Sequence, residues 1–321
     1  RAIVNVYNKT EGAITTPQIA NGANFSVILK EDGTVWTSGY NGSGELGNGT
    51  QIKSNVPLQV KTSENTYLTG IKQISAGREF AAALNEDGEV YVWGNGANGQ
   101  LGQGSSSTGN LLYATKLNKV TEKTVTDAEG NSSIIKEEQE LKDIIQISAG
   151  DTSLFMLTTD GEIYGTGNGG YNEYLEGNEA AHYVVTKVQR VKDVVKIDVG
   201  QGSVFAMISN GETWAWGRNQ HGQLGQGTSD YDFHEEMIKI AENVVHVHTS
   251  FNDFVVYLTE DHKLYGMGKA NYGQLLGYEE LTAHMIYNSD LFTVNSPKLL
   301  MENVAYAVCG KDDVVCMLTD G

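Results

Sequence analysis

Cysteine, proline and cationic side chains are scarce in this chain of 321 residues, and each shortage excludes a class of protein. Its two cysteines, Cys309 and Cys316, are too few for a disulfide framework or a structural zinc knuckle. Three prolines against 38 glycines exclude a collagen-like or Pro/Gly low-complexity chain. Because no apolar run reaches the roughly 18 residues of a membrane-spanning helix, we expect no membrane span.

Positive charge is in the largest deficit. The 22 Lys and Arg residues against 40 Asp and Glu residues give a net charge of −18. Such an excess of negative charge repels phosphate backbones, so we expect no nucleic-acid partner. The hydrophobic share of 40% nevertheless supplies a packed core and excludes a mainly disordered chain.

We expect the sequence to be a fragment or a processed form. It begins with Arg1 and ends with Gly321, and no signal peptide, transit peptide or lipidation motif can be read in it. The low cysteine content, the Asn/Thr/Gly-rich loops and the acidity resemble those of a secreted or surface protein of a bacterium. We therefore predict an extracellular or cell-surface location, with a cytoplasmic location as the alternative.

Internal repetition organises the chain. Similar segments begin near residues 19, 74, 147, 197 and 247, and a shorter sixth segment begins near residue 306. Most of them carry an early glycine that lies 11 residues before a turn glycine. The early glycines are Gly22, Gly77, Gly150, Gly200 and Gly310.

Each repeat has the pattern of short β-strands. Asp-Gly or Asn-Gly dipeptides, as at Asp32-Gly33, separate apolar runs and predict hairpins with type I′ turns. An aromatic residue then recurs three positions before a glycine, and we expect it to pack between neighbouring sheets. These aromatic residues are Trp36, Tyr91, Tyr164, Trp214 and Tyr265. Further on, a Glu or Gln recurs before an apolar residue, where it can hold loop amides. Four short strands in each repeat predict an all-β propeller of four-stranded blades.

Two stretches carry a family resemblance. SAGREFAAALNEDGEVYVWGNGANGQLGQG (75–104) and WAWGRNQHGQLGQG (214–227) resemble the repeat of the regulator of chromosome condensation family. The resemblance covers nearly the whole chain and implies a β-propeller, usually of seven blades, of which about six are visible here. We expect one propeller domain over residues 1–321, with residues 3–7 and the C-terminal strands sharing a blade.

No catalytic constellation stands out in the sequence. It lacks a G-x-S-x-G elbow, a Walker-type phosphate loop and an H-E-x-x-H motif. We therefore predict a protein that is not an enzyme, with no catalytic residue, cofactor site or metal site. His246 and His248 would share one face of a strand, as a metal pair does, but no third ligand can be named. Packing histidines are the preferred interpretation.

Segments that differ between repeats are the candidates for function. Residues 118–141 alternate apolar and polar residues around a turn, which predicts a projecting hairpin. A second insertion, residues 278–298, and the stretch beginning at Ser229 mix aromatic with acidic residues, as a contact surface for a basic partner would. The predicted partner-binding residues are Tyr231, Phe233, His234, Tyr278, Tyr287 and Phe292.

These observations predict a monomeric, non-enzymatic scaffold that binds a protein or a glycan through its variable loops. The resemblance leaves an alternative open, because family members differ in role. In that alternative the protein regulates an enzyme, either as a guanine-nucleotide exchange factor for a small GTPase or as a protein inhibitor.

Overall fold

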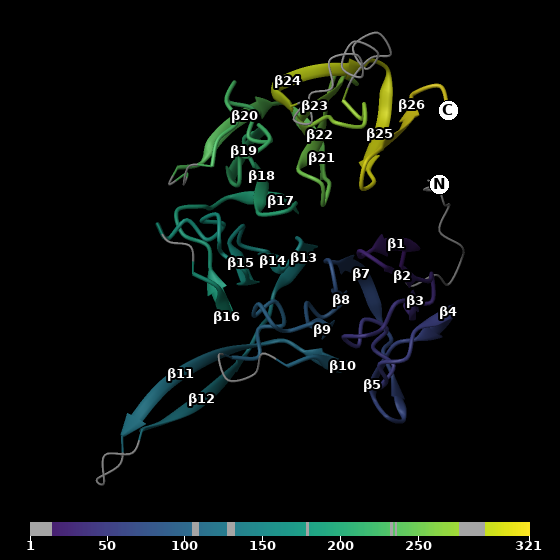
Figure 1. Cartoon of the computed structure of the whole chain (residues 1–321), viewed down its shortest axis with the longest axis vertical. Coiled ribbons are helices and arrows are strands. Elements are labelled where there is room, and N and C mark those ends of the chain that lie inside the picture. Colours follow the sequence, from purple (N-terminus) through teal and green to yellow (C-terminus); the bar gives the residue numbers. More distant parts are fainter. Residues whose placement is uncertain are drawn as a thin grey trace. The chain divides into compact units, whose positions relative to one another are not determined.

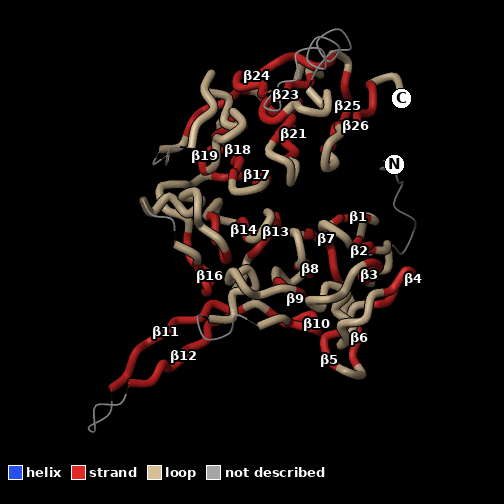
Figure 2. Tube along the Cα trace, in the orientation of Figure 1, coloured by secondary structure: helices blue, strands red, loops and turns tan. Residues whose placement is uncertain are grey.

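The computed structural model describes residues 15–104, 109–126, 132–177, 180–231, 234, 236–275 and 293–321. Within these ranges the regular structure consists of strands and turns, without a helix (Figure 2). In the described part of the chain, no helix has the length and apolarity needed to span a membrane. The prediction of an all-β protein is confirmed.

Five four-stranded antiparallel sheets form the body of the protein, and in each the strands lie side by side in chain order. Sheet 1 contains β1 (Gln18–Asn21), β2 (Phe25–Leu29), β3 (Val35–Gly39) and β4 (Ser54–Gln59). Sheet 2 contains β7 (Ile71–Ala76), β8 (Phe80–Asn85), β9 (Val90–Gly94) and β10 (Leu111–Lys116). Sheet 3 contains β13 (Ile144–Ala149), β14 (Ser153–Thr158), β15 (Ile163–Gly167) and β16 (His182–Lys187). Sheet 4 contains β17 (Val194–Val199), β18 (Ser203–Ile208), β19 (Glu212–Gly217) and β20 (Ile238–Glu242). Sheet 5 contains β21 (Val244–Thr249), β22 (Phe254–Thr259), β23 (Leu264–Lys269) and β24 (Thr293–Met301).

Three two-stranded sheets complete the described structure. The last repeat contributes β25 (Val304–Cys309) and β26 (Val314–Leu318), and a small hairpin between sheets 1 and 2 is made of β5 (Lys61–Ser63) and β6 (Thr66–Tyr67). The insertion before sheet 3 forms β11 (Asn118–Thr126) and β12 (Ser132–Glu140), which pair from Asn118 with Glu140 to Thr126 with Ser132. This hairpin extends away from sheets 2 and 3 (Figure 1), so the prediction made for residues 118–141 is confirmed.

The strands divide between two compact units. Strands β1–β16 belong to an N-terminal unit, and strands β17–β26, together with the loop of residues 170–177, belong to a C-terminal unit. A single propeller domain over residues 1–321 stays a prediction. The strand expected at residues 3–7 lies outside the described residues, and so does its role in a shared blade.

The core lies between neighbouring sheets within each unit. One cluster joins Val27 and Leu46 of sheet 1 and its loop to Ile71 and Trp93 of sheet 2, all fully buried. A second cluster joins sheets 2 and 3, a third joins sheets 4 and 5, and a fourth joins sheet 5 to β25 and β26. Burial of apolar area drives this packing, and sheets stacked through their faces in this way are the blades of a β-propeller.

The hairpin turns correct one prediction. In sheet 1, Gly33 donates its backbone N–H to the carbonyl of Lys30 (3.0 Å), and Gly33 has a φ of 73° while Asp32 is not in the left-handed region. This is a three-residue loop with a left-handed bulge glycine rather than a type I′ turn, which needs positive φ at both central residues. In sheet 5, His262 takes the left-handed position instead (φ 62°).

Candidate functional site

Two kinds of connection lie at the same end of each four-stranded sheet, because the strands form an antiparallel meander. They are the short turn between the first and second strands and the long loop between the third and fourth strands. We call the surface that these connections form in each unit the loop face.

A Glu or Gln side chain holds the described first part of the long loop in all five sheets. Its oxygen accepts a hydrogen bond from the backbone N–H two residues earlier, at 2.7–3.0 Å. The donor and acceptor residues are Ser43 and Glu45, Asn98 and Gln100, Tyr171 and Glu173, His221 and Gln223, and Tyr272 and Gln274. The prediction that the recurring Glu or Gln holds loop amides is confirmed. This bond gives the loops one shared backbone framework.

Two buried tryptophans add a second anchor that the sequence analysis missed. Trp93 donates its indole N–H to the carbonyl of Glu45 (2.8 Å), and Trp216 donates to the carbonyl of Glu173 (2.8 Å). Each ties the long loop that precedes its own sheet. The sequence does carry a signal for this anchor. Each tryptophan directly precedes the glycine that ends its strand, and it lies two positions after the recurring aromatic residue, Tyr91 or Trp214.

The recurring aromatic residues predicted to pack between sheets lie on the third strand of each sheet and are half-buried. Tyr91, Tyr164 and Tyr265 pack against the clusters between neighbouring sheets. Trp36 and Trp214 donate their indole N–H groups to side chains two residues earlier, those of Thr34 (2.9 Å) and Glu212 (3.2 Å).

The early glycines share one geometry at the loop face. Each donates its backbone N–H to the carbonyl three residues later, at 2.8–3.0 Å. This holds for Gly22, Gly77, Gly150, Gly200 and Gly310. In the N-terminal unit the short turns also bond to one another, since Ala23 donates to the carbonyl of Arg78 (2.9 Å) and Arg78 donates to that of Asp151 (3.0 Å). The short turns therefore form a continuous rim across sheets 1 to 3.

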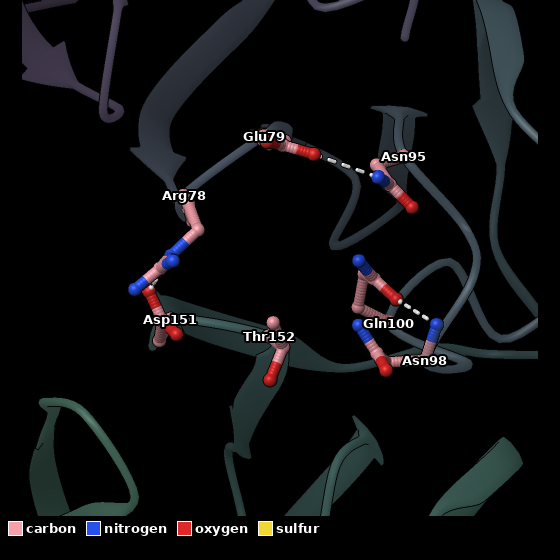
Figure 3. Close-up of a pocket in the computed structure, with 7 residues that line it drawn as sticks. All are labelled: Arg78, Glu79, Asn95, Asn98, Gln100, Asp151 and Thr152. Atoms are coloured by element: carbon pink, nitrogen blue, oxygen red, sulfur yellow. Dashed lines mark hydrogen bonds and ion pairs between the residues drawn. The ribbon is translucent and has the colours of Figure 1, made fainter.

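A pocket of about 270 Å³ opens on the loop face of the N-terminal unit. Its walls come from the short turn and long loop of sheet 2 and from the short turn of sheet 3 (Figure 3). They consist of Arg78, Glu79, Asn95, Asn98, Gln100, Asp151 and Thr152.

The walls of this pocket are polar and largely held in place. The Nε atom of Arg78 bonds to Oδ1 of Asp151 (2.7 Å), and Asn95 donates its amide to Oε2 of Glu79 (2.8 Å). The bond and the charge of Asp151 raise the pKa of Arg78. Figure 3 shows the Arg78–Asp151 pair on one side of the pocket and Gln100 with Asn98 on the other. With one cation and two carboxylates, the pocket has a formal charge of −1 and many hydrogen-bond acceptors.

An ion pair lies between the long loop of sheet 4 and the short turn of sheet 5. The guanidinium of Arg218 bonds to Oδ1 of Asp253 (3.0 Å) through Nη1 and to Oε1 of Gln220 (2.8 Å) through Nε. Its side chain is 12% exposed, and it lies 5.1 Å from the ring centre of Tyr171. Gln223 adds a bond from its amide to Asp253 (3.3 Å).

A chain of polar side chains crosses the edge strands of the C-terminal unit. Lys196 of β17 lies 2.9 Å from Nδ1 of His246 on β21, and Nε2 of His246 lies 2.9 Å from the carbonyl of Ala307 on β25. Burial and the charge of Lys196 lower the pKa of His246 to about 3. The ring centres of His246 and His248 are 6.0 Å apart, and no set of three or more metal-binding side chains occurs among the described residues. Within the described chain, these histidines hold strands together.

The predicted partner-binding residues are only partly described. Tyr231 is 82% exposed, as a contact residue would be. His234 lies with its Nε2 atom 2.7 Å from Oδ1 of Asp230 and is half-buried. The remaining four, Phe233, Tyr278, Tyr287 and Phe292, lie outside the described residues, so the aromatic contact patch stays a prediction.

Neither cysteine forms a disulfide bond. The thiol of Cys309 donates a hydrogen bond to the carbonyl of His248 (3.2 Å).

The repeated four-stranded blades, their anchored loops and their shared early glycines define a β-propeller built from one repeat. The family model of the RCC1-like domain matches residues 4–321. The chain therefore belongs to the RCC1-like domain family, as the sequence analysis anticipated.

Individual relatives agree with this assignment. The chain is 31% identical over 156 residues to the regulator of chromosome condensation of Mus musculus, a match that covers 47% of this chain and 31% of that protein. It is 42% identical over 84 residues to the X-linked retinitis pigmentosa GTPase regulator of Canis lupus familiaris, covering 26% of this chain and 8% of that protein. The crystal structure of Prp20p from Saccharomyces cerevisiae, described with its binding to Gsp1p and histones, is similar with a TM-score of 0.73 at 19% identity. That likeness covers 95% of this chain and 70% of Prp20p, and it shows the shared fold.

Proposed function

We propose that this protein is a non-enzymatic scaffold that binds a partner protein through its loop face. The observation that carries the proposal is the framework shared by the loops of all five sheets. In the described first part of each loop the same Glu or Gln bond holds the backbone, while the side chains that these parts present differ from sheet to sheet. A rigid framework with variable side chains lowers the entropy lost on binding and leaves the choice of partner to the sequence.

The test is capture of a partner followed by binding measurements with the purified components. The protein is immobilised, exposed to an extract of the organism that encodes it, and compared with a loop-face variant, Arg78→Glu with Asn98→Arg. A matched control reverses and adds charge on the β5–β6 hairpin, with Lys61→Glu and Thr66→Arg. We expect the purified partner to lose at least tenfold in affinity for the loop-face variant and to bind the control normally. Equal affinity for both variants, or competition by free sugars in place of protein, would contradict the proposal.

A second candidate function is regulation of a small GTPase. It is favoured by the names of the relatives, one of which is a GTPase regulator. Release of a fluorescent nucleotide from purified GTPases of the same organism separates the two functions. Acceleration by this protein indicates an exchange factor, binding without acceleration indicates a scaffold, and an enzyme assay on the captured partner tests for an inhibitor.

We also propose an extracellular or cell-surface location in a bacterium, which rests on composition alone. The scarce cysteine, the acidic charge of −18 and the Asn/Thr/Gly-rich loops support it. Recovery of the protein in the culture medium or on intact cells is the expected result. Recovery only in the cytoplasmic fraction would contradict the proposal.

A further inference from the structure

We propose that the pocket lined by Arg78, Glu79, Asn98 and Asp151 receives the guanidinium group of an arginine side chain that the partner protein presents. The identity of the partner as a protein rests on the proposed function. The chemistry of the ligand rests on the pocket itself and on its counterpart in the C-terminal unit.

The two places have the same backbone framework. Asn95 follows β9, and its N–H donates to the carbonyl of Glu79 (2.9 Å); Arg218 follows β19, and its N–H donates to the carbonyl of Gly202 (2.8 Å). Five residues further along, Gln100 and Gln223 both anchor their loops by the same bond. Asn95 and Arg218 are therefore equivalent positions.

The C-terminal framework shows what fits between these loops. There the guanidinium of Arg218 is held by Asp253 and Gln220 and faces the ring of Tyr171. In the N-terminal unit the equivalent side chain is the short Asn95, which turns to Glu79 and leaves the pocket open. The protein thus fills one of the two places with its own guanidinium and leaves the other for a side chain from outside.

The walls of the open pocket suit this ligand. A guanidinium carries five N–H donors in a fixed plane and pairs best with carboxylates and other acceptors arranged around it. Glu79 and Asp151 supply carboxylates, and Thr152 and Asn98 supply further oxygens. Because Arg78 balances only one carboxylate, a cation is attracted and a phosphate is repelled. About 270 Å³ lies just below the ~300 Å³ of the smallest common ligand pockets, so it suits one side chain rather than a larger molecule.

The direct test is a titration of the isotope-labelled protein with N-acetyl-argininamide, followed by the NMR signals of the side-chain amides of Asn98 and Gln100. We expect saturable shifts with a dissociation constant on the order of 1 mM, since one side chain is bound. The matched ligand is the citrulline derivative, which has the same shape without the charge and should bind at least about tenfold more weakly. The lysine derivative should also bind more weakly, because it lacks the planar fork.

Two variants test the place of binding. Asn95→Arg gives the N-terminal framework its own guanidinium, as at Arg218, and should abolish arginine binding. Because Asn95 also accepts a hydrogen bond from the N–H of Ala97 (2.8 Å), a thermal melt checks that the variant is folded. Thr66→Arg adds the same charge on the exposed β5–β6 hairpin and should leave binding unchanged. Glu79→Gln keeps the size of the side chain and should weaken binding about tenfold.

Several results would overturn the inference. They are the absence of shifts at ~50 mM argininamide, equal binding of arginine and citrulline derivatives, undiminished binding to the Asn95→Arg variant, and tighter binding of inorganic phosphate. The titration needs no partner protein. If arginine fails to bind while a partner is still captured through the loop face, the pocket inference is wrong and the scaffold stands. If arginine binds and no partner is captured, the pocket inference stands and the scaffold proposal is wrong.

Discussion

At the scale of the residue, the early glycines are required because a side chain at these positions would collide with neighbouring atoms. A Cβ atom on Gly77 would lie 2.0 Å from Cε1 of Phe80 and 2.7 Å from the carbonyl oxygen of Gly150 on the neighbouring short turn. Gly22 meets Phe25 and Gly77 at the same two distances. Where serine follows instead of phenylalanine, the restriction is weaker: at Gly200 the nearest atom is Oγ of Ser203, at 3.2 Å. Glycine is needed most where an aromatic ring covers the turn.

We predict that Gly77→Ala destabilises the protein by about 1–3 kcal/mol, because a methyl group is forced into a packed contact with a ring and with backbone. Gly109→Ala is the matched control, since no atom lies within 4 Å of its added Cβ, and it should change stability by less than ~0.5 kcal/mol. Urea unfolding measures both. Equal stability of the two variants would show that the short turn yields freely.

At the scale of the element, the first strands of neighbouring sheets are joined by side chains, and the two units do this with different chemistry. In the N-terminal unit, Gln73 of β7 donates to the carbonyl of Ile147 on β13 (2.9 Å) and accepts from its N–H (2.9 Å). In the C-terminal unit, Lys196 and His246 hold the equivalent positions, and His246 reaches the carbonyl of Ala307. A neutral amide is thus replaced by groups that titrate.

This replacement predicts a pH dependence. His246 faces Lys196 on β17, the ring of Tyr306 and the carbonyl of Ala307 on β25, and His248 on its own strand. Its pKa is about 3 in the folded protein against 6.5 for an ordinary histidine, so between these values the unfolded chain binds more protons. The contribution of His246 to the free energy of unfolding therefore decreases as the pH falls from about 6.5 toward 3, by at most about 1.4 kcal/mol for each pH unit.

His246→Gln removes this titration and supplies the amide found in the N-terminal unit. We expect a flatter curve of unfolding free energy between pH 6.5 and pH 4 than in the natural protein, measured by urea unfolding at each pH. Burial raises the pKa of Asp198, which acts in the opposite direction but is present in both proteins and cancels in the difference. Identical pH curves would contradict the geometry of this contact.

The β11–β12 hairpin is an element that can be removed. Deleting residues 120–138 and joining the ends with Gly-Ser should change the melting temperature by less than about 3 °C, because Lys119 and Gln139 are paired and a shorter loop closes at little cost. Lys119, which lies 3.9 Å from the ring of Tyr164, is retained. A fall of more than ~10 °C would show that the hairpin supports sheet 3.

The repeat made most of the strands predictable, since turn glycines and alternating apolar residues mark each hairpin locally. The turn type was not predictable from Asp32-Gly33, because the same dipeptide fits a bulged three-residue loop. The pocket was also missed: its residues come from two sheets, and Asp151 lies 56 residues after Asn95. The spacing of residues within one repeat does not show which residues of two different repeats lie close together. The loop anchors, Glu45 and its equivalents, were predictable because they recur at the same position in each repeat.

At the scale of the whole molecule, the excess of negative charge agrees with the proposal that the pocket of the N-terminal unit receives a basic side chain of a partner protein. A net charge of −18 attracts basic proteins from a distance and makes their association sensitive to salt. The family assignment shows the architecture, while the function depends on the side chains that this chain presents. The central claim is that these side chains lie on the loop face.

Hydrogen–deuterium exchange of the protein, free and bound to its purified partner, tests that claim most directly. The account predicts that binding slows amide exchange in the loop-face segments of the N-terminal unit, residues 77–79, 95–104 and 150–152, and leaves the opposite turns at Gly33, Gly88 and Gly161 unchanged. Protection confined to those opposite turns, or to the β11–β12 hairpin, with unchanged exchange at the loop face would contradict it.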